Sequence, residues 1–336
     1  MKKRIYIAYT GGTIGMKASK DGFIPIKGHL TESIMKVPDF HRSEMPEFTI
    51  NEYSPLIDSS DMTPNDWQLI ANDIYRHYDD YDGFVVLHGT DTMAYTSSAL
   101  SFMFEHLSKP IIVTGSQIPF SQLRSDGQEN LLNALYIAAN YPISEVGLFF
   151  NNKLFRGNRS IKAYADGFDA FDSPNMPALL EAGINIKVKA GKLSDGLTAK
   201  PILHQMTPQP VGVVHLYPGI STELIENVIK QPVKALILKS YGVGNAPQNQ
   251  AILACLSKAN NNGIIIVNCS QCIRGTVNMG GYATGSALSQ CGVISGIDMT
   301  LEAALTKLHF LLSSEFSTEQ IKQQMCTNLR GELTDY

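Results

Sequence analysis

Short runs rich in β-branched and aromatic residues alternate with longer amphipathic runs over the first half of this 336-residue chain. The pattern predicts strands at 4–9, 48–53, 83–87, 110–114 and 146–150, and helices near 63–77, 92–106 and 126–140. Strands that alternate with helices at this rhythm are typical of a parallel sheet with helices on both faces. We therefore expect an α/β fold with a three-layer N-terminal domain around a mostly parallel sheet.

A second alternation of the same kind follows an irregular stretch at 151–177 and a segment rich in Lys, Ala, Gly and Ser. It predicts strands at 211–216, 234–239 and 264–268, and helices at 221–230, 248–261, 299–313 and 317–328. The chain length also suits two domains. The expected organisation is a larger domain over 1–186, a linker over 187–208 and a smaller α/β domain over 209–336.

Composition excludes several classes of function. A net charge of −4 gives no electrostatic footprint for nucleic acid or an anionic membrane. No apolar run is long enough to span a bilayer, and the run Ile5–Tyr9 after the basic N-terminus is too short for a signal peptide. Five cysteines do not form a disulfide framework, so we expect a cytoplasmic protein with reduced thiols. Cys269 and Cys272 form a C-x-x-C without a second ligand pair, and neither a metal nor a cofactor is expected.

Three polar loops follow predicted strands. They are Thr10–Gly15, Ile57–Met62 and His88–Thr92. The carboxyl ends of strands in an open α/β sheet meet at one edge, where ligands bind. Each loop alone is also explained by turns and helix caps, and His88 by packing at a strand end. The first loop fits neither common nucleotide-binding pattern. Together the loops bring threonines and carboxylates to one cleft, where Lys162 would be tuned for proton handling if it lay beside Asp91.

The motifs occur in the order found in L-asparaginases, and the chain resembles most the bacterial cytoplasmic type I enzymes. The matching segments are Thr10-Gly11-Gly12-Thr13-Ile14-Gly15, Asp58-Ser59-Ser60-Asp61-Met62, His88-Gly89-Thr90-Asp91-Thr92, Lys162 and Ser240-Tyr241-Gly242-Val243-Gly244-Asn245. The resemblance runs from about residue 4 to Leu333. It implies hydrolysis of L-asparagine to L-aspartate and ammonia, without a cofactor, by a homodimer that pairs into tetramers.

The resemblance also implies roles for individual residues. Thr13 matches the nucleophile that forms an acyl-enzyme. Thr90, Asp91 and Lys162 match a second polar triad that activates a threonine or the attacking water, and covalent catalysis and direct water attack both stay open. The substrate's α-amino and α-carboxylate groups would be held by Asp58, Ser59, Ser60, Thr90 and Asp91, with Asn245 reaching the site from the C-terminal domain.

Two positions depart from the family pattern. Phe23 stands where the family has a tyrosine on a mobile lid over the site, so no hydroxyl relays a proton there. Lys239 stands where an arginine is expected in a second, regulatory asparagine site, whose other matching positions are Ser270, Gln271 and Cys272. Lysine does not replace a bidentate guanidinium contact.

Two other functions remain open from the sequence. One is the asparaginase-like subunit of an archaeal-type tRNA amidotransferase, which would carry extra N-terminal sequence ahead of the first strand and need a partner. The other is a catalytically inactive asparagine sensor, which Phe23 and the possible second site make conceivable. Release of ammonia from asparagine or glutamine separates these functions.

Overall fold

A computed structural model describes residues 2–20, 22–141, 143–190, 200–281 and 283–335. The chain divides into two compact units, 1–204 and 205–336. The division lies inside the segment predicted as a linker. Two strands nevertheless occupy parts of that segment and pair within the first unit, namely β13 (Ile186–Val188) with β12 (Leu180–Ala182) and β14 (Ile202–Leu203) with β6 (Phe104–Glu105). Residues 191–199 lie outside the described part.

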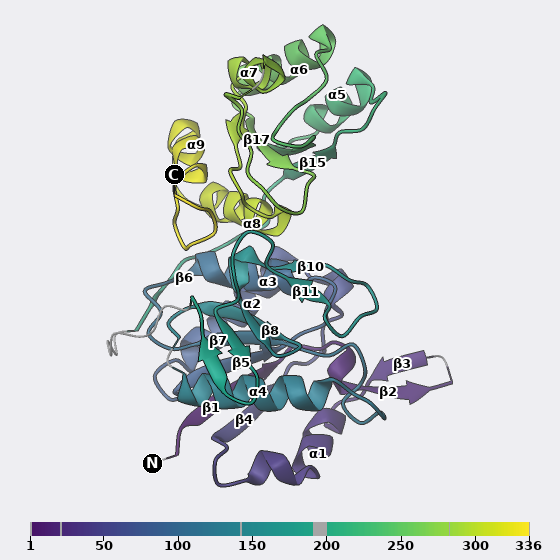
Figure 1. The fold of residues 1–336 in the computed structure, drawn as a ribbon, viewed down its shortest axis with the longest axis vertical. Coiled ribbons are helices and arrows are strands. Elements are labelled where there is room, and N and C mark those ends of the chain that lie inside the picture. Colours follow the sequence, from purple (N-terminus) through teal and green to yellow (C-terminus); the bar gives the residue numbers. More distant parts are fainter. Residues whose placement is uncertain (1, 21, 142, 191–199, 282, 336) are drawn as a thin grey trace. The chain divides into compact units, whose positions relative to one another are not determined.

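The first unit is built around an eight-stranded sheet in the order β13-β12-β9-β8-β7-β5-β1-β4. Its parallel strands are labelled in Figure 1. Five consecutive strands, from the edge strand inward, pair in parallel: β4 (Glu47–Glu52), β1 (Arg4–Tyr9), β5 (Gly83–Leu87), β7 (Ile111–Thr114) and β8 (Val146–Phe150). Beyond β8 the pairing with β9 (Lys153–Arg156), β12 and β13 is antiparallel. The mostly parallel sheet expected from the sequence is confirmed.

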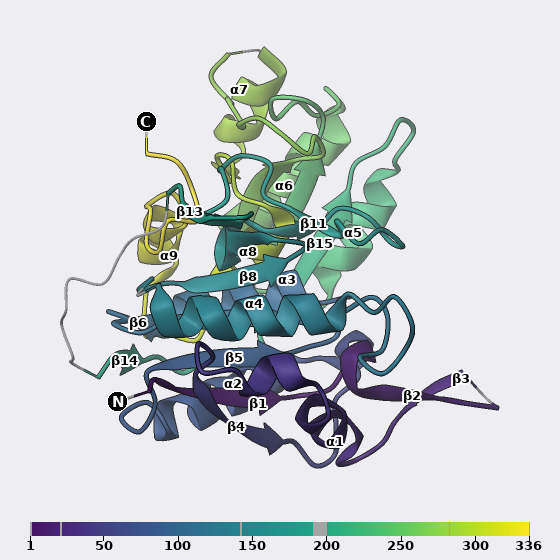
Figure 2. The ribbon, with the colours of Figure 1, turned by 60° about the horizontal axis from the view of Figure 1, so that its bottom comes forward.

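Helices cover both faces of this sheet. On one face, Ile5, Ile7 and Tyr9 of β1 pack in a core with Leu131 and Leu135 of α4 (Gly127–Asn140), which runs along the sheet in Figure 2. On the other face, Tyr6 stacks on His77 at 4.4 Å at the end of α2 (Pro64–Arg76), and α3 (Met93–Met103) packs on β8. Because both faces are buried, the strands read as continuous apolar runs.

Several short elements were not predicted. A hairpin of β2 (Met16–Ser19) and β3 (Gly22–Pro25) extends away from the sheet in Figure 2, and α1 (His29–Met35) follows it. The helix predicted over 92–106 ends at Met103, where the chain turns into β6 and pairs with β14. The stretch expected to be irregular contains β9, β10 (Ile161–Lys162) and β11 (Phe171–Asp172).

The second unit has a smaller parallel sheet in the order β15-β16-β17-β18. The strands are β15 (Val211–His215), β16 (Ala235–Ser240), β17 (Ile265–Ser270) and β18 (Ile294–Ser295). The helices are α5 (Thr222–Lys230), α6 (Gln250–Asn261), α7 (Ala283–Gln290), α8 (Leu301–Leu312) and α9 (Thr318–Met325). The predicted alternation is thus confirmed, with α7 and β18 as additions and with the last helix ending at Met325. Among the described residues, no helix is long and apolar enough to cross a membrane.

Candidate active site

Three loops meet at the carboxyl edge of three adjacent strands, β5, β1 and β4. Backbone hydrogen bonds tie them together: Thr10 N donates to Leu87 O at 3.0 Å, and Ile57 N donates to Thr10 O at 2.7 Å. The Thr92 hydroxyl closes the set by donating to Ser59 O at 2.6 Å. The predicted convergence of the loops therefore follows from the parallel order of the strands.

Glycine at two positions allows the loops to approach this closely. Gly12 has φ of 90°, and a Cβ there would lie 2.4 Å from Gly89 N. Gly11 has φ of 146°, and a Cβ would lie 2.1 Å from Ile57 O. The neighbours are backbone atoms that cannot turn aside. Any larger residue would separate the loops.

Thr13 follows directly and begins a 3₁₀ turn over Thr13–Gly15 that is closed by a bond from Gly15 N to Gly12 O at 3.3 Å. Its side chain is half-buried. The hydroxyl makes no hydrogen bond with any residue that the structure describes. The loop thus holds the backbone of Thr13 firmly and leaves its hydroxyl available to a ligand.

The ammonium of Lys162 links the second loop to β10. Lys162 Nζ donates to Thr90 Oγ1 at 2.9 Å and to Asp91 Oδ1 at 2.7 Å. Lys162 is mostly shielded, with 20 % of its side chain exposed, whereas 63 % of Asp91 is exposed. The fold therefore joins Thr90, Asp91 and Lys162 in one cluster, in which a cation lies against a hydroxyl and a carboxylate.

The third loop presents a carboxylate beside hydroxyls. Asp58 Oδ1 accepts hydrogen bonds from both the backbone N and the hydroxyl of Ser60 at 2.9 Å. Ser59 is buried, and its side chain lies against Gly89 of the second loop. A carboxylate with adjacent hydroxyls and backbone N–H groups can bind the ammonium and carboxylate of an amino acid.

His88 is a structural residue rather than a base. Its ring is fully buried, with Nδ1 2.7 Å from Gly89 O and Nε2 2.8 Å from the Thr96 hydroxyl. Because a carbonyl only accepts, Nδ1 carries the proton and Nε2 accepts from Thr96. Burial lowers the pKa of His88 to about 4. A neutral, doubly hydrogen-bonded ring agrees with the packing interpretation of the sequence.

Gln117, in the loop after β7, was not anticipated from the sequence. The Thr90 hydroxyl donates to its Oε1 at 3.1 Å. Its backbone N is held by Asp126 at the start of α4, 2.9 Å from Oδ2. Burial raises the pKa of Asp126, which the backbone N–H groups of Gln117 and Ile118 oppose. The sequence signal available was a polar residue after a fourth parallel strand, the same signal that identified the other loops.

The remaining predicted site residues lie in the second unit. Asn245 pairs with Tyr241 in an isolated bridge after β16. The four positions of the possible regulatory site gather at the carboxyl ends of β16 and β17. There Lys239 Nζ donates to Ser270 O, and Gln271 Nε2 donates to Leu216 O at 2.6 Å and to Lys239 O at 2.7 Å. The Ser270 hydroxyl accepts from Cys272 N at 3.0 Å.

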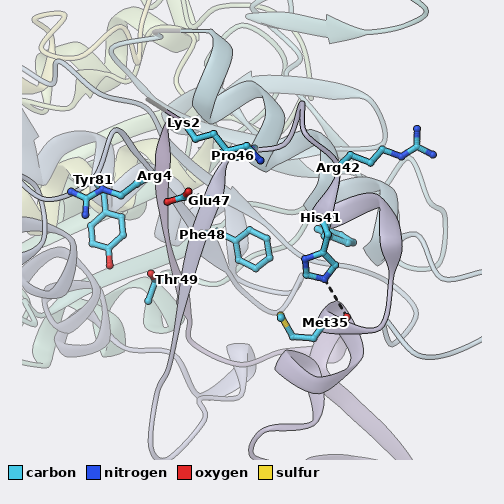
Figure 3. A pocket seen from close by; sticks show the side chains of 11 residues that line it. Lys2, Arg4, Met35, His41, Arg42, Pro46, Glu47, Phe48, Thr49 and Tyr81 are labelled. Carbon is cyan, nitrogen blue, oxygen red and sulfur yellow. Dashed lines mark hydrogen bonds between the residues drawn. The ribbon is translucent and has the colours of Figure 1, made fainter.

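A separate pocket of about 450 Å³ lies at the opposite, amino edge of β1 and β4. Figure 3 shows Arg4, the first residue of β1, with Glu47 and Thr49 of β4. The Arg4 guanidinium lies over the Tyr81 ring at 5.6 Å. The pocket contains none of the predicted site residues and does not belong to the loop cluster.

Two family models match the chain. Residues 4–193 match the N-terminal asparaginase domain, and residues 210–325 match the glutaminase/asparaginase C-terminal domain. The chain belongs to the asparaginase family. It is 66 % identical over 333 residues to L-asparaginase 1 of Escherichia coli (strain K12), covering 99 % of this chain and 98 % of that one.

Solved structures agree with this membership. L-asparaginase I from Vibrio cholerae O1 biovar eltor superposes with a TM-score of 0.93 at 61 % identity, covering 99 % of this asparaginase and all of that chain. The thermostable L-asparaginase from Thermococcus kodakarensis superposes with a TM-score of 0.90 at 29 % identity, with the same coverage. The fold of this asparaginase is therefore shared even with an L-asparaginase that is only 29 % identical to it.

Proposed function

We propose that this chain is an L-asparaginase that hydrolyses L-asparagine to L-aspartate and ammonia. The observation that carries the proposal is the Lys162–Thr90–Asp91 cluster, 2.9 and 2.7 Å across its two hydrogen bonds, beside a glycine-rich loop that presents Thr13. Family membership supports the same reaction.

In the proposed mechanism the Thr13 hydroxyl attacks the side-chain amide carbon of asparagine. The hydroxyl proton leaves as the C–O bond forms, and the tetrahedral oxyanion is stabilised by backbone N–H groups of the loops. The C–N bond then breaks, and ammonia departs with a proton. Water attacks the resulting ester, releases aspartate and restores the Thr13 hydroxyl. Lys162, held by Thr90 and Asp91, takes part in the proton transfers of these steps.

Recognition of the amino acid is assigned to the polar loops. Asp58 and Asp91 would bind the α-ammonium, while the hydroxyls of Ser59, Ser60 and Thr90 would bind the α-carboxylate. Asn245 would complete the site from a C-terminal unit. This set fixes the α-carbon end of the substrate and so places the amide carbon within reach of Thr13.

Ammonia release by the purified chain tests the proposal. We expect turnover with L-asparagine, which an inactive sensor would lack, and glutamine measured alongside reports side-chain selectivity. Thr13→Ala should abolish turnover while the protein stays folded, because no hydroxyl remains to attack. Thr49→Ala, an exposed threonine at the other end of β4, is the matched control and should keep full activity. Near-normal turnover of Thr13→Ala would refute the assigned nucleophile.

We further propose that the chain assembles as a homodimer or homotetramer in the cytoplasm. All five cysteines are free, which suits a reducing compartment. Leu123, whose side chain is 90 % exposed, is an apolar residue that contact between copies would remove from water. Sedimentation equilibrium tests this proposal, and a monomer at micromolar concentration would contradict it.

Allosteric control is proposed at the cluster of Lys239, Ser270, Gln271 and Cys272. The support is their convergence at one sheet edge, where their polar groups already hold one another and nearby carbonyls. A sigmoidal dependence of rate on asparagine concentration that becomes hyperbolic in Ser270→Ala is expected. A hyperbolic curve in the unmodified protein would refute it.

A further inference from the structure

We infer that Gln117 is a positioning residue of the reaction, which directs the Thr90 hydroxyl proton away from Lys162 and joins the Thr90 loop to the loop that follows Lys162. The inference rests on the proposed function and extends it to a residue outside the three sequence motifs. It is carried by four hydrogen bonds that leave one arrangement of protons.

The orientation of the Gln117 amide is fixed by its nitrogen. Nε2 donates to Gly167 O at 3.0 Å and to Ala165 O at 3.2 Å. Both partners are backbone carbonyls, which only accept, so the NH₂ group must face them. The amide oxygen must therefore face Thr90. In a flipped amide, Oε1 would face the carbonyl oxygens of Ala165 and Gly167, and neither of these can donate a hydrogen bond to it.

The direction of the Thr90 hydroxyl follows. Its oxygen lies 3.1 Å from Gln117 Oε1, which only accepts, and 2.9 Å from Lys162 Nζ. A hydroxyl has one proton to donate. That proton goes to Gln117, and a lone pair of Thr90 accepts from the Lys162 ammonium. The resting site thus holds the Thr90 proton on the side away from the lysine.

This arrangement has a consequence for proton transfer. The Lys162 ammonium has no lone pair, so it can accept a proton from Thr90 only after it has given one up, for instance to Asp91, whose Oδ1 lies 2.7 Å from Nζ. The Thr90 hydroxyl must also turn from Gln117 to Nζ, with the loss of one hydrogen bond. Gln117 therefore keeps the lone pair of Thr90 aimed at the ammonium until substrate or water binds. The same side chain holds residues 165–167 near Thr90, and these begin three residues after Lys162 in the chain.

Gln117 can act in this way because its own backbone is rigidly held. Asp126 accepts from Gln117 N at 2.9 Å and from Ile118 N at 3.0 Å. Asn130, one turn along α4, donates to Asp126 Oδ2 at 3.2 Å and to Gly115 O at 3.0 Å. A continuous path of hydrogen bonds thus leads from the buried Asn130 of α4 to Thr90.

Steady-state kinetics of asparagine hydrolysis test the inference. Gln117→Met keeps the length of the side chain and removes both the acceptor and the donors. We expect kcat to fall by about 10- to 100-fold, as for a misplaced catalytic group. We expect KM to change by less than about threefold, because Asp58, Ser59, Ser60 and Asp91 still bind the substrate and only the Thr90 hydroxyl loses its partner. Gln122→Met, a glutamine substitution in the same loop, is the matched control and should leave both constants unchanged.

Gln117→Glu distinguishes the two roles of Gln117, which are to orient the Thr90 hydroxyl and to hold the loop at residues 165–167. It keeps an acceptor for Thr90 but loses the donors to the Ala165 and Gly167 carbonyls. Its kcat should lie above that of Gln117→Met. A kcat equal to or below the methionine variant would mean that the link to the loop alone matters and would overturn the assigned direction.

The folded state of each variant is checked through the fluorescence of Trp67, the single tryptophan. If Gln117→Met does not fold, Gln117→Asn, which is too short to reach Thr90, is held to the same thresholds. A kcat within twofold of the unmodified enzyme, or a loss confined to KM, refutes the inference and leaves the proposed function standing. An unmodified protein that releases no ammonia refutes both.

Discussion

Acidification should destabilise the first unit through His88. The ring is fully buried between Gly89 O and the Thr96 hydroxyl, and its pKa is lowered to about 4 from the ordinary 6.5. In the unfolded chain the same imidazole titrates near 6.5. The folded and unfolded states therefore differ in bound protons over this interval.

The sign and magnitude follow from linkage. Above pH 6.5 the ring is neutral in both states, so His88 adds no pH dependence to the free energy of unfolding. Between pH 6.5 and about 4 the unfolded chain binds a proton that the folded chain does not, so the free energy of unfolding falls as pH falls. At about 1.4 kcal/mol per pH unit, the whole interval amounts to roughly 3 kcal/mol. Below pH 4 both states are protonated and the effect is complete.

The assay compares the unmodified protein with His88→Gln by urea unfolding at pH 7, 6, 5 and 4.5. Trp67 lies in α2 of the first unit, so its fluorescence follows the unit that contains His88. His88→Gln lowers stability at pH 7 but has no ring to titrate, so the gap between the two proteins should narrow by more than about 2 kcal/mol by pH 4.5. The exposed His41→Gln is the control and should run parallel to the unmodified protein. A gap that changes by less than about 1 kcal/mol would refute the reasoning, because no proton difference would then accompany unfolding.

Three further substitutions probe the proposed lid residue Phe23, a buried ion pair and the loop contact. Phe23→Tyr, on a side chain that is 51 % exposed, should raise kcat if a lid hydroxyl relays a proton, and an unchanged rate would show that another relay serves. Lys307→Met leaves Glu332 buried without the ammonium that lies 2.5 Å from it, and hydrogen exchange should show α8 and α9 less stable by about 3–5 kcal/mol. Lys230→Met, at an exposed lysine, should change the stability of these helices by less than about 0.5 kcal/mol. Equal effects of the two substitutions would contradict the burial argument. Gly12→Ala should abolish ammonia release, since its Cβ would meet Gly89 N at 2.4 Å, whereas Gly28→Ala, at φ of 79° with open space around it, should stay active; full activity of both would refute the contact.

The predicted strands that agree best with the structure are those that carry their own boundaries. Residues 4–9, 83–87 and 146–150 are continuous apolar runs bounded by polar or glycine-containing segments, and their observed bounds are the same. Burial on both faces of a parallel sheet produces such runs, so the pattern was sufficient. The same local signal marked the three loops that follow the strands.

Predictions were wrong or incomplete where pairing partners lie far apart in the chain. Phe104 and Glu105 were expected to extend a helix but form a strand, because Ile202 and Leu203 pair with them. Local propensity cannot report a partner at such separation. The stretch expected to be irregular contains β9 for another reason, because Phe155 pairs with the nearby Leu148 of β8 across a turn at Asn151 and Asn152, whose φ values are 44° and 64°. This hairpin is a local feature that the predicted pattern did not include.

The sequence by itself determined the α/β class and the loops that contain Thr13, Asp58 and Thr90. These depend on residue type and on spacing along the chain, which are local properties, whereas Phe23 stands out only against the pattern of the family that the chain resembles. Tertiary structure decided that Lys162 lies against Thr90 and Asp91 and that Gln117 holds the Thr90 proton. Those contacts depend on the folded positions of β10 and of the loop after β7, and the direction of a hydroxyl proton follows only from the acceptors that surround it.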